Sequence, residues 1–381
     1  MIVAIPMPVL TIEKASPLAK APDRLRIVHL LNELAHLGNG IVNVAIDLAI
    51  EQARAGHDVT VAAPPGTFVD LLEANGVAHF PLEPRGGLRP ITATIALHAF
   101  VRDHDTQIVH AHMMAGAVIG RLACIGTGAR LVTTVHNSWQ RHAVLMRLGH
   151  RVIAVSDSVR EDMISRGIPQ LRISTVHNAT DGNRRGDTIS GELPVTLEHP
   201  NVLSVAGMFE RKGIVDLIEC AVLLREKVAK VHVYLAGDGP DRAAFEALAR
   251  ERGVEEFVTF LGFRADVPAL LQQADVFVLA SRAEPFGLVL SEARSAAVPI
   301  VATRVGGIPE ALDGGIAGTL VPSTDPHALA LALERMLLDD DHRESMRLGA
   351  YSNAEKRQVA RASRETVSVY RDAIVDGEAR V

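Results

Sequence analysis

Short apolar runs alternate with stretches of helical periodicity along most of the chain. In the first half, six such runs predict strands: LRIVHLL, DVTVAAP, QIVHAH, RLVTTVH, RVIAVS and ISTVHN. The stretches between them, such as IVNVAIDLAIEQARAG, carry apolar residues at helical spacing. This alternation is typical of parallel strands joined by crossover helices. It therefore predicts a doubly wound α/β domain over residues 25–180.

The same pattern begins again after a stretch with little periodicity, residues 181–200, which we interpret as a linker. Six further runs predict the strands of a second doubly wound domain over residues 201–355: NVLSVAG, VHVYLAG, VTFLG, VFVLAS, PIVATR and GTLVP. Residues 356–381 predict a C-terminal helix that crosses back to the first domain, and residues 1–24 a loose tail. Two such sheets that face each other form a cleft at the carboxyl ends of their strands, where ligands bind.

Composition and charge exclude several classes of protein. Lys plus Arg is 39 and Asp plus Glu is 45, so the net charge of −6 offers no basic field for nucleic acid, and we expect no such partner. The two cysteines, Cys124 and Cys220, lie far apart in apolar stretches, which excludes a disulfide framework. The sequence also lacks the pattern of a cleaved leader and the apolar length of a membrane span. We therefore expect a cytoplasmic protein.

Gly38 and Gly40 follow a predicted strand and precede a predicted helix. Glycines at a helix N-terminus let backbone amides approach an anion such as a diphosphate. The sequence does not complete the dinucleotide-binding fingerprint, because a third glycine is missing and the next strand ends in Ala-Pro instead of an acidic residue. The sequence thus does not support a nicotinamide cofactor. An anion-binding turn and a plain helix-capping turn both fit the two glycines.

The segment EPFGLVLSEA directly follows the predicted strand VFVLAS. Glu284 stands before the predicted helix and Glu292 lies on it, while the amides of Phe286, Gly287 and Leu288 form its N-terminus. Amides suit phosphate and carboxylates suit sugar hydroxyls, so the segment indicates a phosphorylated, polyhydroxylated ligand. The alternative is that both glutamates are ordinary charges of a solvated helix.

Arg211 and Lys212 in GMFERKG place two cations at another strand end. They could neutralise a diphosphate without a metal, or they could be a solvated surface pair. His136 closes the strand RLVTTVH at the same edge. His110 and His112 point to one face of a strand, but the sequence offers no third ligand at metal-site spacing, so we expect no metal.

The segment SWQRHAVLMRLGHR, residues 138–151, combines apolar and basic residues. As a helix it could lie on the inner, anionic membrane surface and reach a lipid-linked acceptor. An ordinary domain helix with a solvated basic face fits the same composition. The sequence leaves this peripheral membrane contact open.

Together these motifs resemble those of the retaining, nucleotide-sugar-dependent glycosyltransferases with the GT-B fold, of the group 1 or family 4 type. The resemblance covers about residues 25–350. Its most specific part is the family's E-x7-E segment followed by a Gly-Gly turn and a distal glutamate, here Gly306, Gly307 and Glu310. VHAH, TTVHN and STVHNATD follow the family's order. The resemblance implies two Rossmann-like domains facing across a cleft, the first binding the acceptor and the second the nucleotide sugar.

The resemblance also implies catalytic roles for His136, Glu284 and Lys212. By position, Glu292 binds the donor ribose, Glu284 contacts the donor hexose, and His136 reaches the sugar near the reacting centre. Lys212 and Arg211 hold the diphosphate, where fixed cations stabilise charge that develops in the transition state. Other donor-binding residues that it implies are Gly38, Gly40, Gly262, Phe263, Arg264, Phe286, Gly287 and Leu288.

The sequence departs from the family pattern at three positions. Met208 stands where the family commonly has arginine, Ala179 where it has the glycine of N-G-V-D, and Ala297 where it has a glycine before the next strand. We expect retaining transfer of a hexose-type sugar from a nucleoside diphosphate donor, without cofactor or metal, to a hydroxyl acceptor of a cell-surface polysaccharide, glycolipid or small glycoside. The alternatives are a nucleotide-sugar epimerase of the same architecture and a non-catalytic nucleotide-sugar-binding protein. The paired glutamates in their EPFG context favour the transferase.

Overall fold

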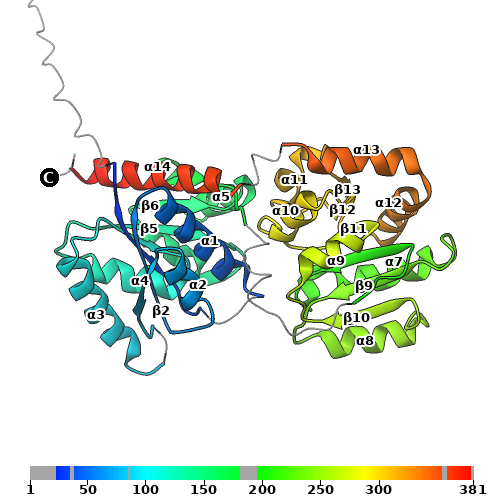
Figure 1. Cartoon of the computed structure of the whole chain (residues 1–381), viewed down its shortest axis with the longest axis horizontal. Coiled ribbons are helices and arrows are strands. Elements are labelled where there is room, and N and C mark those ends of the chain that lie inside the picture. Colours follow the sequence, from blue (N-terminus) through cyan, green and yellow to red (C-terminus); the bar gives the residue numbers. More distant parts are fainter. Residues whose placement is uncertain (1–22, 35–37, 85, 181–194, 354–357, 379–381) are drawn as a thin grey trace, which may run out of the picture.

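The computed structural model describes residues 23–34, 38–84, 86–180, 195–353 and 358–378. Figure 1 shows two α/β lobes side by side, each built around one parallel sheet. The predicted architecture of two doubly wound sheets is confirmed. Most of the predicted N-terminal tail and of the predicted linker lies outside the described residues.

Within the described residues, the first lobe contains a seven-stranded sheet with five α-helices and two 3-10 helices. Its strands are β1 (Arg26–Leu30), β2 (Asp58–Ala63), β3 (Ala78–Pro81), β4 (Ile108–Ala111), β5 (Arg130–Val135), β6 (Arg151–Ala154) and β7 (Ile173–Thr175). Its helices are α1 (Gly40–Arg54), α2 (Val69–Ala74), α3 (Arg89–Asp103), α4 (Met114–Ala123), α5 (Asp157–Ser165), η1 (Arg141–Leu148) and η2 (Gln170–Arg172).

The second lobe contains a six-stranded sheet, and the chain ends in helix α14. Its strands are β8 (Asn201–Val205), β9 (His232–Ala236), β10 (Val258–Gly262), β11 (Val276–Leu279), β12 (Ile300–Thr303) and β13 (Thr319–Val321). The helices that follow β8 are η3 (Glu210–Lys212), α7 (Ile214–Leu224), α8 (Arg242–Glu251), α9 (Val267–Gln273), α10 (Leu288–Ser295), α11 (Ile308–Ala311), η4 (Asp313–Gly315), α12 (Pro326–Leu338), α13 (Asp340–Tyr351) and α14 (Val359–Glu378).

The strand orders place a switch point in each sheet. The first sheet runs β3-β2-β1-β4-β5-β6-β7 and the second β10-β9-β8-β11-β12-β13. The chain therefore changes direction across the sheet between β1 and β4, and again between β8 and β11. Ligands of open parallel sheets bind in the crevice at the carboxyl ends of the strands beside such a point. His112 and His136 follow β4 and β5, and Lys212 and Glu284 follow β8 and β11, so all four lie at these ends.

Sequence pattern predicted every strand except β3. The other twelve are apolar runs, as expected for strands covered on both faces. β3 reads AHFP, is exposed or half-buried along its length, and lies at the edge of the first sheet. An edge strand needs no continuous apolar run and tolerates Pro81, so it escapes a search for such runs.

Helix α14 returns from the second lobe and packs on α1, β5 and β6 of the first lobe (Figure 1). Tyr370 is fully buried there among apolar side chains of the first sheet. At the start of the helix, Arg361 Nη2 donates to the His177 carbonyl at 2.7 Å, and near its end Asp376 pairs with Arg151 at 2.6 Å. The last helix of the chain thus completes the core of the first lobe.

Residues 138–151 form the 3-10 helix η1 and its flanks, not the α-helix that a membrane-surface role predicts. Ala143 and Met146 are buried, whereas Trp139 and Arg147 are exposed. Much of the apolar surface of this segment therefore faces the core. Among the described helices, none has the length and apolar character needed to cross a membrane. Contact of this segment with a membrane surface stays a prediction.

Candidate active site

The two lobes meet at the carboxyl ends of their strands. A Cβ on Gly40, at the start of α1, would lie 3.0 Å from Leu288 Cδ1 of the second lobe, so glycine permits this close approach. The His177 ring stacks on Phe286 with centroids 5.5 Å apart. The structure thus brings the glycine turn of one lobe against the EPFG segment of the other, although the two are far apart in the sequence.

Glu310 links the lobes by hydrogen bonds. Its carboxylate accepts from the amides of Asp157 (2.6 Å) and Ser158 (3.0 Å) at the N-terminus of α5, and from His177 Nε2 at 2.9 Å. Burial raises the pKa of Glu310, but these hydrogen bonds outweigh burial and bring the pKa below its ordinary value. The distal glutamate of the sequence motif therefore holds the second lobe on a helix terminus of the first.

Lys212 and Glu284 form an ion pair inside the second lobe, with Nζ 2.6 Å from Oε2. The side chains are only 18% and 9% exposed, and Ser281 Oγ donates to the same carboxylate oxygen at 3.2 Å. The backbone fixes this pairing, because Gly213 has φ +67° and a Cβ there would lie 2.0 Å from the Ala280 carbonyl oxygen. The sequence placed these two charges at separate strand ends, and the structure joins them.

The EPFG segment is held by the Gly-Gly turn after β12. Gly307 N donates to the Glu284 carbonyl at 3.1 Å, and a Cβ on Gly306 (φ +51°) would lie 1.9 Å from that oxygen. Gly287 (φ +85°) caps α10 and supplies no side chain to its first amides. Those amides therefore remain available to an anion. Glu292 lies half-buried one turn into α10.

Arg211, and not position 208, supplies a second cation here. Met208 is 1% exposed and packs in the core of the second lobe. The Arg211 guanidinium lies 4.3 Å from the Phe209 ring centroid and 5.5 Å from that of Trp139 in the first lobe. Its Nε is buried and has no hydrogen-bond partner in the part of the chain that the structure describes. A role in holding a diphosphate stays a prediction.

Gly262, Phe263 and Arg264 lie at the end of the edge strand β10. The Gly262 carbonyl accepts from Gly237 N at 2.7 Å, and Arg264 pairs with Asp266 at 2.5 Å. β9 and β8 separate β10 from β11, so these residues are placed apart from the Lys212 and Glu284 pair. Their assignment to the nucleotide base stays a prediction.

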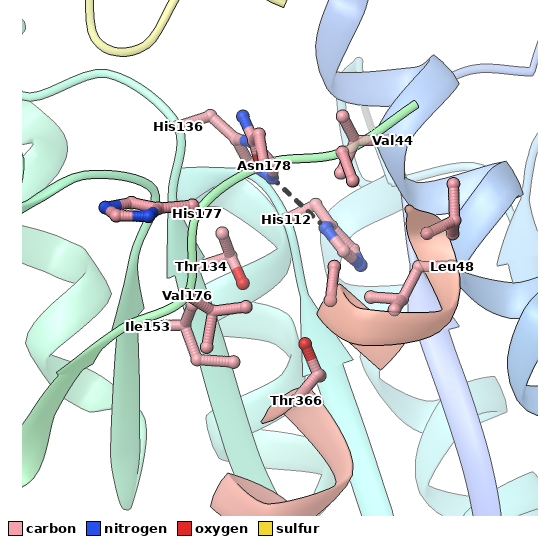
Figure 2. Close-up of a pocket in the computed structure, with 13 residues that line it drawn as sticks. Val44, Leu48, His112, Thr134, His136, Ile153, Val176, His177, Asn178 and Thr366 are labelled. Carbon is pink, nitrogen blue, oxygen red and sulfur yellow. Dashed lines mark hydrogen bonds between the residues drawn. The ribbon is translucent and has the colours of Figure 1, made fainter. Parts of the chain in front are cut away.

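His136 lies at the exit of β5 and is 8% exposed. It lines a pocket of about 350 Å³ together with polar side chains of the first lobe, namely Asn32, Glu33, Asn39, Asn137 and Gln140. On its other side is a smaller cavity, drawn in Figure 2, to which α14 contributes Thr366 and β5 contributes Thr134. Burial lowers the pKa of His136 to about 3, so the ring is neutral at physiological pH.

A buried cluster of His29, His110 and His112 lies behind His136, and the expectation that His110 and His112 lack a third companion is wrong. His29 on β1 pairs in register with His110 on β4, so the third ring comes from a neighbouring strand and not from a local motif. Ring nitrogens of the three lie within 4.8 Å of one another, a spacing that a metal could use. However, all six ring nitrogens already have protein partners, so hydrogen bonding accounts for the cluster.

A second group with possible metal-ligand spacing lies at the contact between the lobes, formed by Asp157, His177 and Glu310. The Glu310 carboxylate is already occupied by two amides and His177. Asp157 Oδ1 accepts from Thr175 Oγ1 at 2.5 Å. The described contacts therefore explain this group as a link between lobes.

Comparison with known proteins agrees with this architecture. The model of Glycosyltransferase Family 4 matches residues 38–184, and that of Glycosyl transferases group 1 matches residues 187–353. A D-inositol 3-phosphate glycosyltransferase of Corynebacterium kroppenstedtii is 34% identical over 209 residues, covering 52% of this chain. The N-acetyl-alpha-D-glucosaminyl L-malate synthase of Bacillus anthracis is 27% identical over 338 residues, covering 81% of this chain.

The first match spans about half of the relative, 45% of the Corynebacterium enzyme, whereas the second spans 87% of the Bacillus enzyme. The crystal structure of HepE from Anabaena, in complex with UDP and glucose, has a TM-score of 0.74 at 21% identity, covering 91% of this chain and 99% of HepE. One family model thus matches each lobe in the expected order. The chain belongs to family 4 of the glycosyltransferases, the group 1 type, and has the GT-B fold.

Proposed function

We propose that the protein is a retaining glycosyltransferase that moves a hexose-type sugar from a nucleoside diphosphate donor to a hydroxyl acceptor. The observation that carries the proposal is the Lys212–Glu284 pair beside the amides of α10, in the lobe that meets Gly40 across the cleft. A cation and helix amides suit a diphosphate, and carboxylates suit sugar hydroxyls. The site therefore contains groups that suit the diphosphate and the sugar of a nucleotide sugar.

The chemistry follows from where charge develops. As the bond from sugar to diphosphate breaks, negative charge grows on the leaving oxygen, and fixed donors aimed at it lower the barrier. The Lys212 ammonium has three N–H donors, so it can hold Glu284 and a phosphate oxygen at the same time. Glu284 keeps the ammonium in place at 2.6 Å while remaining able to accept from a hexose hydroxyl.

The acceptor, in this proposal, occupies the 350 Å³ pocket beside His136. The described residues that line it include four amide side chains and Glu33, but neither lysine nor arginine. Asn32 Oδ1 is buried and has no partner within the described part of the chain, so it is ready to accept from a ligand hydroxyl. This lining favours an uncharged, polyhydroxylated acceptor over a phosphorylated or carboxylated one.

The direct test is an assay of UDP-glucose with a panel of neutral polyols and glycosides, since HepE was solved with UDP and glucose. We expect release of UDP with formation of an α-linked glycoside. Conversion of the donor to an epimer would indicate the isomerase alternative instead. Binding of UDP-glucose without UDP release in the presence of any acceptor of the panel would indicate a binding protein.

The two glutamates should affect binding differently. Glu292→Ala should weaken UDP and UDP-sugar alike, because the ribose is present in both ligands. Glu284→Ala should lower kcat more than it weakens UDP, because UDP lacks the hexose. Calorimetric titration with UDP separates the two, with Glu255→Ala, exposed between α8 and β10, as the control. Equal UDP affinity in wild type and Glu292→Ala would remove the ribose assignment.

Activity should survive chelation, because a lysine and helix amides already face the proposed diphosphate site. In excess EDTA we expect most of the rate to remain. Glycosyltransferases that need a divalent ion lose activity under these conditions, so one such enzyme serves as the control. Complete loss that Mn²⁺ or Mg²⁺ restores would overturn the metal-free mechanism.

A further inference from the structure

A continuous chain of hydrogen bonds runs from His136 into the core of the first lobe. His136 Nε2 lies 3.2 Å from His112 Nδ1 (Figure 2), and His112 Nε2 lies 2.9 Å from His29 Nδ1. His29 Nε2 lies 2.8 Å from Gln52 Oε1 on α1, and Gln52 Nε2 donates to Tyr370 Oη on α14 at 3.3 Å. Three secondary-structure elements, β1, α1 and α14, and the two loops that follow β4 and β5 thus form this path to the site.

The orientation of the Gln52 amide assigns a direction to this chain. Its carbonyl oxygen can only accept, so His29 Nε2 carries the proton and His29 Nδ1 is an acceptor. His112 must therefore donate from Nε2, which leaves its Nδ1 to accept from His136. Beyond the amide, Tyr370 Oη accepts from Gln52 Nε2 and donates to His110 Nδ1 at 2.6 Å. From His136 to Tyr370, every donor on this path points away from the site.

We propose that this chain fixes His136 as the Nε2–H tautomer and leaves Nδ1 to accept a hydrogen bond from a substrate hydroxyl, with Gln52 and Tyr370 as positioning residues. The tautomer follows from the orientation of the Gln52 amide together with these distances, whereas its catalytic use rests on the proposed function. A neutral ring that accepts through Nδ1 aligns a hydroxyl of the donor sugar or the acceptor. The reversed tautomer would present N–H to that hydroxyl instead.

Burial disfavours charged rings and unpaired ring nitrogens in this chain of hydrogen bonds. His29, His110 and His112 are fully or almost fully buried, and burial lowers the pKa of each, that of His29 to about 4. Charged rings are thus disfavoured, and each neutral ring has one proton and one acceptor. Because a buried N–H without an acceptor destabilises the folded protein, the rings must order their protons together.

The proposal is tested by determining the tautomer of His136 with ¹⁵N NMR of the full-length protein. The His136→Gln variant identifies which ring signals belong to His136. In wild type we expect Nε2–H. Gln52→Met keeps a side chain of similar length but removes the acceptor for His29 Nε2–H. The proton should then move to His29 Nδ1, each following ring should reverse, and His136 should become Nδ1–H. We expect kcat/KM to fall on the order of tenfold with UDP affinity unchanged.

Ile50→Ala is the matched control, because Ile50 is buried on the same helix in the same core and carries no polar group. It should destabilise the lobe without changing the tautomer. If Gln52→Met does not fold, Tyr370→Phe tests the same point. Without the Tyr370 hydroxyl the Gln52 amide loses its second partner and can rotate, so His136 should become a mixture of both tautomers.

A wild-type His136 in the Nδ1–H or imidazolium form, or a Gln52→Met protein whose His136 keeps Nε2–H, would overturn the proposal. Wild type with the expected tautomer but no glycosyl transfer would refute the proposed function alone.

Discussion

Replacing Lys212 by methionine is expected to lower kcat/KM for glycosyl transfer by roughly two to three orders of magnitude. Losses of about this size follow the removal of a preorganised group that stabilises charge in the transition state. Methionine keeps the unbranched stem but removes the ammonium that lies 2.6 Å from Glu284 Oε2. The charge on the departing diphosphate would then depend on Arg211 and the α10 amides. Steady-state kinetics at saturating acceptor measures the loss.

The same change also leaves the Glu284 carboxylate, 9% exposed, without its partner. Breaking a buried pair from one side destabilises a protein by about 3–5 kcal/mol, and somewhat less at this degree of exposure. Lys212→Met/Glu284→Gln removes both charges, so most of the stability should return while activity stays low. Urea unfolding and kcat/KM, measured on wild type and on these two variants, separate the structural role of the pair from its catalytic role.

A double neutralisation of a neighbouring ion pair in the same lobe provides the control. Arg282 pairs with Asp216 through two contacts of 2.8 Å, with side chains 29% and 9% exposed. Arg282→Met/Asp216→Asn should change stability by a similar amount and leave kcat/KM near wild type. If Lys212→Met has wild-type kinetics, or the double variant at 212 and 284 regains activity, the pair is structural and the diphosphate lies elsewhere.

The positions at strand ends were predictable because each follows an apolar run. A parallel sheet carries ligand groups at its carboxyl edge, so locating the strands β5, β8 and β11 located His136, Lys212 and Glu284 as well. Two departures from the family pattern also have visible outcomes. Met208 is buried in the core, and Ala297 adopts φ +54°, the left-handed region in which glycine is preferred.

The chain of hydrogen bonds behind His136 was not predictable, because its members are single polar residues inside apolar segments. Gln52 is 318 residues from its partner Tyr370, and His110 is 260 residues from it. Their meeting depends on the register of β1 with β4 and on the return of α14 to the first lobe. One usable signal was present: the neighbouring strands LRIVHLL and QIVHAH both carry histidine at an interior position. For Glu310, the motif indicated the residue but not the helix terminus that holds it.

The free energy of unfolding should fall steeply as the pH drops from 6.5 toward 4. In the native state burial lowers the pKa of His29 to about 4 and of His136 to about 3, and it lowers the pKa of His110 and His112 as well. In the unfolded chain these rings bind a proton near pH 6.5. Between those limits only the unfolded state takes up protons. The contribution of each neutral ring to the free energy of unfolding is therefore complete above pH 6.5 and is lost as the pH falls.

Each such ring changes stability by about 1.4 kcal/mol per pH unit within this window. Two rings over two units already amount to about 5–6 kcal/mol, comparable with the whole stability of many domains. Urea unfolding at pH 7.5, 6.5, 5.5 and 4.5 measures the slope. His29→Gln should reduce the slope by about one proton, whereas Ile50→Ala, which removes no titratable group from the same core, should leave the slope unchanged. A slope below one proton between pH 5 and 6 would mean that the buried rings are already charged in the native protein, and the ordered chain that ends at His136 could not then exist.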